Sequence, residues 1–153
     1  MLKLSKLSFK GLVRVMNLYP PYVGAGVRIK VTDEKNKDLQ VEMNLTKLNR
    51  NYMGTHFGGS LYSMIDPFYC LILIHKLGKE YLVWDKSASI DFKSPGRGRV
   101  KAFFHISEDE VQEIKNKVEE LGKYEPDFKV SIVDENDKVV AIANKKLWVK
   151  KKD

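Results

Sequence analysis

The sequence predicts an α+β protein in which a curved antiparallel sheet wraps around one long central helix, with an extra helix late in the chain. Two observations lead to this class. Segments with apolar residues at every second position occur in pairs along the chain, separated by polar turns, as in antiparallel strands. Between the first and second pair, residues 57–75 are almost entirely apolar, as expected of a helix that a sheet surrounds.

The first third of the chain is predicted to hold a short helix and a hairpin. Residues 3–17 place leucine, valine and methionine at spacings of three and four, which indicates an amphipathic helix. Pro20 and Pro21 end this segment, because proline cannot continue a helix. Residues 27–32 and 39–45 then alternate around a polar stretch and are predicted to pair with each other.

Two further hairpins are expected in the second half of the chain. Residues 81–92 and 99–106 alternate on either side of residues 94–98, whose Ser-Pro-Gly-Arg-Gly composition is typical of a turn. Residues 128–133 and 139–149 alternate around another polar turn. The sequence therefore predicts six strands.

A late helix is expected between the second and third hairpins. Ser107 is followed three residues later by Glu110, the pattern of a capping box, and Gly122 gives the stop. A length of 153 residues is the usual size of one domain. We expect residues 1–153 to form a single domain, with residues 1–22 as its N-terminal helix and proline-containing link.

Composition argues against several classes of function. The 27 Lys and Arg against 20 Asp and Glu give a net charge of +7, but the lysines are spread along the chain without a nucleic-acid-binding motif, so no nucleic-acid partner is expected. Residues 57–74 approach the length of a membrane span, but Gly58-Gly59 and Asp66-Pro67 interrupt them, and we expect no span. With one cysteine, Cys70, and no signal-peptide pattern, a cytoplasmic location is expected.

Asp66 is the one charged residue within the apolar run, and a carboxylate buried alone is costly unless it is paired or used. It ends a motif, Asn-x-x-Gly-x-x-x-Gly-Gly-x6-Asp, that begins at Asn51. In this motif and in the order of its elements, the chain resembles the hotdog-fold acyl-CoA thioesterases of the phenylacetate-pathway type. Residues 90–96 resemble that family's strand and proline turn near bound CoA, while the late helix and Asp66-Pro67 are more similar to an uncharacterised thioesterase-like branch.

The resemblance implies a hotdog fold and a thioester hydrolase whose site lies between two subunits. In such a site the Gly58 N–H donates to the oxyanion, Asp66 acts as general base or as nucleophile, and Asn51 holds the water. Gly58 and Asp66 are eight residues apart, about 12 Å along a helix, so one subunit cannot easily bring both to one carbonyl. A homodimer or a dimer of dimers is expected, which would also cover an edge strand of the sheet.

Phe57 departs from the family motif, which usually has histidine at this position. Phe57 is a harmless filler if that histidine only packs and hydrogen-bonds the loop, and activity is lost if the histidine polarises the thioester. His56 is a poor replacement, because adjacent side chains point in different directions. The resemblance places Phe57 and Gly59 in the part of the loop that binds substrate.

CoA carries phosphates, so an acyl-CoA site needs positive charge near its mouth. Lys93, Arg97 and Arg99 flank the proline turn and are the candidates for phosphate contacts, with a basic solvated turn as the alternative. Asp85, on the preceding strand, occupies a region that contributes a hydroxyl or carboxylate in some relatives. Its alternative is a solvent-facing position.

No cofactor is expected apart from the coenzyme A of the substrate, an acyl thioester, and no metal site, because the histidines lack partners at metal-ligand spacing. A non-catalytic acyl-ligand-binding or regulatory protein on the same fold stays open as an alternative, and a dehydratase is a weaker one. Each of these residues also has a purely structural interpretation. In that interpretation Asn51 caps a turn, Gly58-Gly59 forms a tight loop, and Asp66 is an interface residue that is hydrogen-bonded to the backbone.

Overall fold

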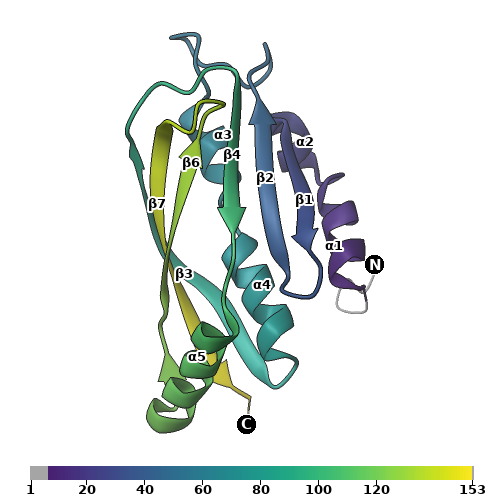
Figure 1. The fold of residues 1–153 in the computed structure, drawn as a ribbon, viewed down its shortest axis with the longest axis vertical. Coiled ribbons are helices and arrows are strands. Elements are labelled where there is room, and N and C mark those ends of the chain that lie inside the picture. The colour runs from purple at the N-terminus through teal and green to yellow at the C-terminus, as the bar shows by residue number, and fades with distance from the viewer. Residues whose placement is uncertain (1–6, 153) are drawn as a thin grey trace.

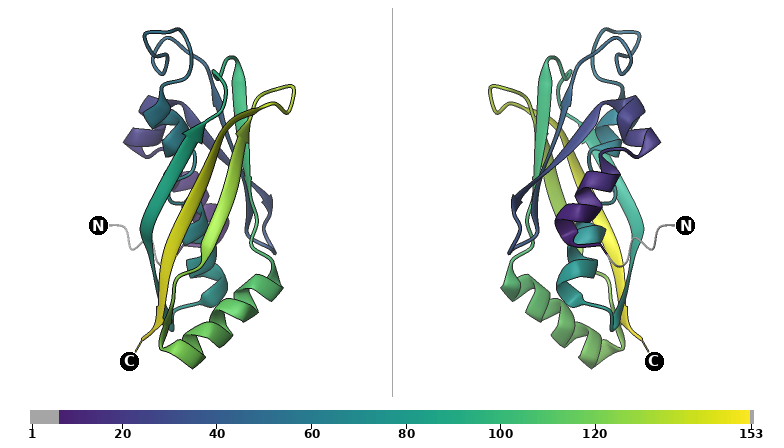
Figure 2. Two further views of the ribbon diagram at one scale, coloured as in Figure 1. Left: turned by 90° about the vertical axis from the view of Figure 1, so that its left-hand side faces the viewer. Right: turned by 90° about the vertical axis from the view of Figure 1, so that its right-hand side faces the viewer.

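The computed structural model describes residues 7–152, and its centre is one curved antiparallel sheet (Figure 1). The strands follow one another across the sheet in the order β1 (Val27–Asp33), β2 (Asp38–Asn44), β4 (Arg99–Phe104), β6 (Asp127–Val133), β7 (Val139–Lys151) and β3 (Tyr81–Phe92). A two-residue strand that the sequence did not predict, β5 (Lys123–Tyr124), also pairs with β7. The views in Figure 2 show the sheet on one side of the molecule and the central helical segments inside its curve.

The predicted central helix is present as two consecutive segments, α3 (Gly58–Ser63) and α4 (Phe68–Leu77). Pro67 separates them, because it has no N–H to continue the hydrogen-bond ladder. The side chains of Phe68, Ile72 and Leu73 are fully buried against the sheet. A curved sheet around a central apolar helix is therefore confirmed.

Two short helices precede the sheet. Helix α1 (Phe9–Met16) is capped by Ser8, whose side chain accepts a hydrogen bond from the Gly11 N–H. The first residues of the helix predicted over 3–17 lie outside the described part of the chain. Instead of only ending a helix, the two prolines open a second one, α2 (Pro20–Ala25), because the first turn of a helix does not need their missing N–H groups.

The first and last hairpins are confirmed, but the prediction that residues 81–92 pair with residues 99–106 is wrong. Strand β3 pairs with β7, and β4 pairs with β2 and β6. The connection from β3 to β4 is a crossover, because β6 and β7 lie between these two strands in the sheet. Its backbone hydrogen bonds go to other segments. Lys93 and Ser94 donate to the Val140 carbonyl, and the Gly98 carbonyl accepts from the Leu45 N–H.

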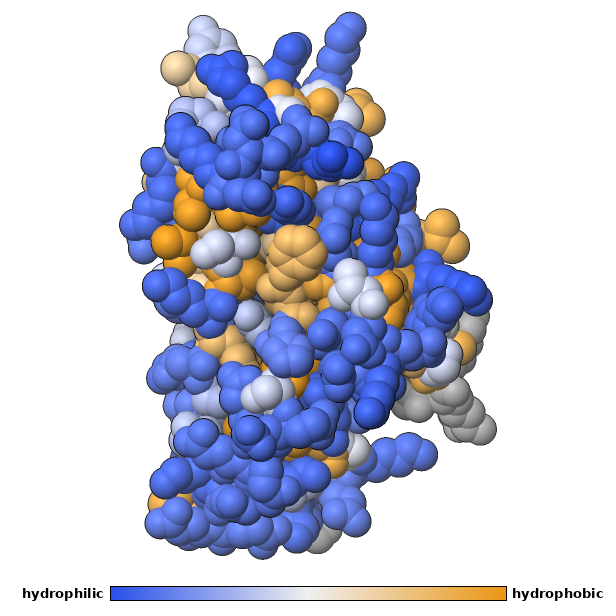
Figure 3. All heavy atoms as spheres, viewed as in Figure 1, coloured by the Kyte–Doolittle hydropathy of each residue, from blue (hydrophilic) through white to orange (hydrophobic). Residues whose placement is uncertain are grey.

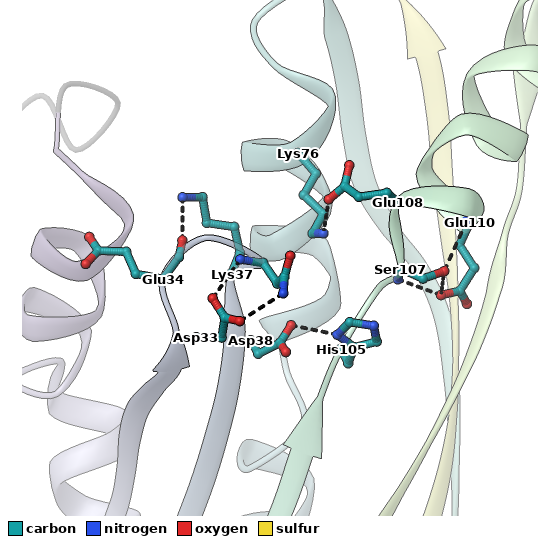
Figure 4. A network of polar contacts seen from close by, with 10 residues as sticks. Asp33, Glu34, Lys37, Asp38, Lys76, His105, Ser107, Glu108 and Glu110 are labelled. Atoms are coloured by element: carbon teal, nitrogen blue, oxygen red, sulfur yellow. Dashed lines mark hydrogen bonds and ion pairs between the residues drawn. The ribbon is translucent and has the colours of Figure 1, made fainter.

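Helix α5 (Glu108–Leu121) has the predicted capping box, in which Ser107 and Glu110 bond reciprocally, and it ends at Gly122 in the left-handed conformation. Figure 4 shows how polar contacts tie this helix to its neighbours. Lys76 of α4 pairs with Glu108 at 2.6 Å. These contacts lie at the end of the molecule away from the loops around residues 45–57 (Figure 1).

Hydrophilic side chains cover most of the face seen in Figure 3, with apolar side chains between them. Strand β2 illustrates the cause, since Leu39, Val41 and Met43 are fully buried while Gln40 and Glu42 are partly exposed. Such alternation places apolar groups under the sheet and polar groups on its outer side. The apolar inner side of the sheet packs on the helical segments, and the polar outer side faces solvent.

Candidate functional site

A cavity of about 540 Å³ lies where the loop before α3 meets the crossover that follows β3. Residues 51–58 and residues 92–97 form most of its wall. The structure thus brings together Asn51, Gly58, Lys93 and Arg97, four of the predicted site residues. Asp66 and Asp85 do not line this cavity.

Gly58 is the first residue of α3 and lies at the cavity wall. Its N–H and that of Gly59 donate to no other group among residues 7–152, as expected at a helix start. A Cβ atom on Gly58 would come within 3.0 Å of the Phe92 ring. Glycine therefore keeps a free backbone donor accessible beside Phe92.

Asn51 lines the cavity, but its amide also holds the loop together. Its Nδ2 donates to Thr55 Oγ1 at 3.0 Å and to the His56 carbonyl at 3.2 Å. Its Oδ1 accepts from the Thr55 N–H at 3.1 Å. Asn51 is therefore a loop-organising residue in this structure, and one acceptor lone pair of Oδ1 is left for a water molecule.

His56 is buried in the wall of the cavity. Its Nε2 lies 2.9 Å from the Gly98 carbonyl, and because a carbonyl can only accept, Nε2 carries the proton. Its Nδ1 is buried without a hydrogen-bond partner among the described residues. Burial lowers the pKa of His56, although the bond to Gly98 acts against this. A neutral His56 thus anchors the crossover.

Phe57 points largely to solvent, with 56% of its surface exposed, and it is not among the residues of the cavity wall. Gly59 lies beneath its ring, since a Cβ on Gly59 would come within 2.5 Å of Phe57 Cε1. In one chain these two residues pack on each other at the surface.

The three basic candidates separate in the structure. Lys93 and Arg97 are exposed at the cavity wall, and Lys93 pairs with Asp91 at 3.5 Å. Arg99 instead pairs with Glu135 at 3.6 Å and lines a second, smaller cavity with Lys30 and other charged residues. The structure does not bring Arg99 to the cavity of Gly58.

Asp66 and Asp85, which the sequence analysis treated separately, meet at a single buried lysine. Lys145 Nζ lies 2.6 Å from Asp66 Oδ1 and 2.7 Å from Asp85 Oδ1. The lysine side chain is 1% exposed, whereas those of Asp66 and Asp85 are 45% and 28% exposed. The arrangement is therefore a buried ammonium beneath two carboxylates that remain in contact with solvent.

A bulge in β3 places Asp85 and Phe92 on the same, inner side of the strand. The pairing of β3 with β7 shifts register between Asp85 and Ser87. Asp85 is opposite Leu147 and Ala88 is opposite Lys145, so odd-numbered positions face inward before the bulge and even-numbered ones after it. Phe92 follows on the same inner side and reaches Gly58.

Burial and neighbouring charges shift the pKa values of three groups in and around the cluster, namely Lys145, Tyr22 and Cys70. Burial alone lowers the pKa of Lys145, but the hydrogen bonds and charges of Asp66 and Asp85 outweigh it and raise that pKa. Burial raises the pKa of Tyr22, and Asp66 adds to the effect, so that its hydroxyl stays protonated and donates to the Asp66 carbonyl at 2.6 Å. Cys70 is inert, because burial raises the pKa of its thiol to about 12.

Lys145 is the residue that the sequence analysis missed, although the pattern held a signal. Strand β7 buries Ala141, Ala143, Leu147 and Val149 on one face, and Lys145 occupies the middle position of that face. A lysine among inward positions requires a carboxylate partner. The same requirement applied to Asp66.

No helix within residues 7–152 is long and apolar enough to cross a membrane. Residues 7–152 also contain no group of three His, Cys, Asp or Glu side chains arranged to hold a metal ion.

Solved structures share this architecture. A Pseudomonas aeruginosa protein of unknown function, described as a probable thioesterase, is 16% identical, with a TM-score of 0.78 over 94% of each chain. The thioesterase HI1161 of Haemophilus influenzae is 14% identical, with a TM-score of 0.68 over 99% of this chain and 96% of that one. The PaaI protein of the Escherichia coli phenylacetic acid degradation operon is 18% identical, with a TM-score of 0.60 over 92% and 90%.

At these identities the likeness establishes the fold alone, which is the hotdog fold. The chain itself belongs to the family described as "Domain of unknown function (DUF4442)", which matches residues 10–149. No curated protein matches the chain.

Proposed function

We propose that this protein is a thioester hydrolase that acts on an acyl-CoA or a similar acyl thioester. The observation that carries the proposal is the cavity lined by Gly58, whose backbone N–H has no acceptor among residues 7–152 and so could stabilise negative charge on a carbonyl oxygen bound there. The likeness to proteins described as thioesterases supports it.

In the proposed reaction a water molecule adds to the thioester carbonyl while Asp66 takes up its proton. The oxygen of the tetrahedral intermediate accepts a hydrogen bond from the Gly58 N–H. The C–S bond then breaks, the thiolate leaves, and the proton passes from Asp66 to the sulfur, giving a carboxylic acid and a thiol. Lys93 and Arg97 would contact the phosphates of CoA at the mouth of the cavity.

Two copies of the chain would complete the site, because Asp66 is absent from the cavity wall of its own chain. Strand β3 is an edge of the sheet, twelve residues long and exposed from Trp84 to Ser89. If two β3 strands pair antiparallel across a two-fold axis, the early part of one lies beside the late part of the other. Asp85 and its neighbour Asp66 would then approach the cavity behind Phe92 of the partner subunit.

The test is hydrolysis of a panel of acyl-CoAs, followed with a thiol reagent. We expect turnover by the native protein and a loss of about 100-fold or more in kcat for Asp66→Asn, since a positioned base contributes about 10²–10⁴-fold. The exposed Asp109→Asn on α5 is the matched control and should keep full activity. Activity that survives Asp66→Asn would refute the assigned base.

A non-catalytic acyl-ligand-binding protein is the second candidate, and two observations favour it. Phe57 stands where the family motif has histidine, and Lys145 already occupies one oxygen of Asp66. The same panel separates the two functions, because a binding protein would be stabilised against thermal unfolding by an acyl-CoA without releasing thiol.

A further inference from the structure

We propose that Lys145 is a positioning residue of the hydrolytic site, which holds Asp66 so that its second oxygen, Oδ2, faces the attacking water. This inference rests on the proposed function and adds a residue that neither the family motif nor the comparisons assign. Lys145 is fixed in turn by Asp85, and the three side chains act as one unit.

The geometry assigns each donor of the ammonium a direction. Lys145 Nζ donates to Asp66 Oδ1 at 2.6 Å, forms an ion pair with Asp85 Oδ1 at 2.7 Å, and lies 5.8 Å from the centre of the Tyr62 ring. With one oxygen of Asp66 held, the carboxylate cannot rotate freely about its terminal bond. Its Oδ2 is not engaged by this ammonium, and the side chain is 45% exposed.

Lys145 and Asp66 differ in how far their side chains are buried, and this difference gives them different roles. At 1% exposure the ammonium cannot reach a substrate, so it acts through the carboxylate rather than on the thioester. Bonds to two carboxylates also keep it protonated and unable to serve as a nucleophile. The exposed side of the unit is the pair of carboxylates, which carries one net negative charge with the ammonium.

The charge balance depends on the groups around Asp66. The titratable groups around Asp66 and Lys145 come from five elements, namely Tyr22 of α2, Tyr62 of α3, Cys70 of α4, Asp85 of β3 and Lys145 itself of β7. The hydroxyl of Tyr22 and the thiol of Cys70 stay protonated because burial raises their pKa values. Removing Lys145 therefore leaves two adjacent carboxylates without a cation.

The test is the pH profile of kcat and of kcat/KM for Lys145→Met. We expect kcat to fall by about 100-fold, since a misplaced catalytic group costs this much. We also expect the acid limb of the kcat/KM profile to move to higher pH, because two neighbouring carboxylates without a counter-charge share a proton more readily. Adding Asp85→Asn to Lys145→Met should bring the limb back while kcat stays low.

The matched control is Lys146→Met, which removes the neighbouring lysine and its outer pair with Asp127, and should leave both profiles unchanged. A native protein that cleaves no thioester refutes the proposed function. An active native protein whose folded Lys145→Met variant keeps the native kcat and pH profile refutes the positioning role but not the proposed function. Should Lys145→Met fail to fold, Asp85→Asn alone must move the acid limb to lower pH, and an unmoved limb overturns the inference.

Discussion

The hydroxyl of Tyr22 donates a hydrogen bond of 2.6 Å to the backbone carbonyl of Asp66. Tyr22 is buried on α2, 44 residues earlier in the chain, and its ring stacks on Phe68 at 5.9 Å. The carbonyl belongs to residues 64–67, which lie between α3 and α4, and no backbone N–H of the described residues donates to it. Helix α2 therefore supports the backbone from which the Asp66 side chain extends.

Tyr22→Phe should lower the free energy of unfolding by about 1–2 kcal/mol, because it removes one hydrogen bond and leaves the carbonyl without its donor. The ring and its packing are kept, so the change reports the hydroxyl alone. Urea unfolding followed by circular dichroism measures it. The control is Tyr19→Phe on the exposed neighbour of the same helix start, and an equal loss in both variants would contradict the assignment.

How far the sequence predicts this fold depends on whether a signal is local. Alternation located the strands, and the spacing of Ser107 and Glu110 located the start of α5 within one turn. Alternation carries no information about the partner of a strand, and so the pairing of residues 81–92 was assigned to the next strand in sequence instead of to β7. That pairing joins residues that lie between 49 (Phe92 and Ala141) and 70 (Tyr81 and Lys151) positions apart in the chain.

In the candidate site, too, the local signal was predictable from the sequence and the distant partner was not. The requirement that a carboxylate in an apolar helix be paired or used correctly marked Asp66, but its partner Lys145 lies 79 residues further on. Proximity of that kind comes from the way β7 and β3 curve around the central helix, and no spacing in the sequence encodes it. The bulge after Asp85 is equally invisible, although it decides which β3 side chains face inward.

Gly58→Ala should reduce kcat/KM by about tenfold or more while changing stability by less than about 0.5 kcal/mol. The new methyl group comes within 3.0 Å of Phe92 Cζ. The exposed Phe92 ring can move aside, but the methyl group and the displaced ring then fill part of the cavity beside the free N–H. Gly24→Ala is the control, because a Cβ there meets nothing within 4 Å. Steady-state kinetics and thermal unfolding of both variants decide the matter, and full activity in Gly58→Ala would contradict the role of this cavity.

Ser89→Arg should convert the proposed assembly into single chains of 17.6 kDa. Ser89 is exposed on edge strand β3, where a second β3 would have to approach, and it lies opposite Asn144 on the outer side of the sheet. An arginine there places a large charged side chain in the interface. Light scattering during size-exclusion chromatography gives the mass, with Asn144→Arg on neighbouring β7 as the control. A native protein that elutes as a single chain would refute the two-chain site.

His56 should lower the free energy of unfolding of the protein at acidic pH. Burial lowers the pKa of His56, so between this value and the value of about 6.5 in the unfolded chain the unfolded state binds more protons. The free energy of unfolding therefore falls as the pH drops below about 6.5, and it is restored above that pH. His56→Gln keeps a donor for the Gly98 carbonyl but has no proton to gain.

The stability difference between the native protein and His56→Gln should consequently be largest near pH 8 and shrink toward about pH 5, as measured by urea unfolding at each pH. His105→Gln, at an exposed position, serves as the control. Its free energy of unfolding should fall toward low pH as that of the native protein does, because His56 is still present. A difference that stays constant with pH would mean that His56 takes up its proton equally in the folded and unfolded chain. The wall of the cavity would then be open to water at His56 rather than closed over it.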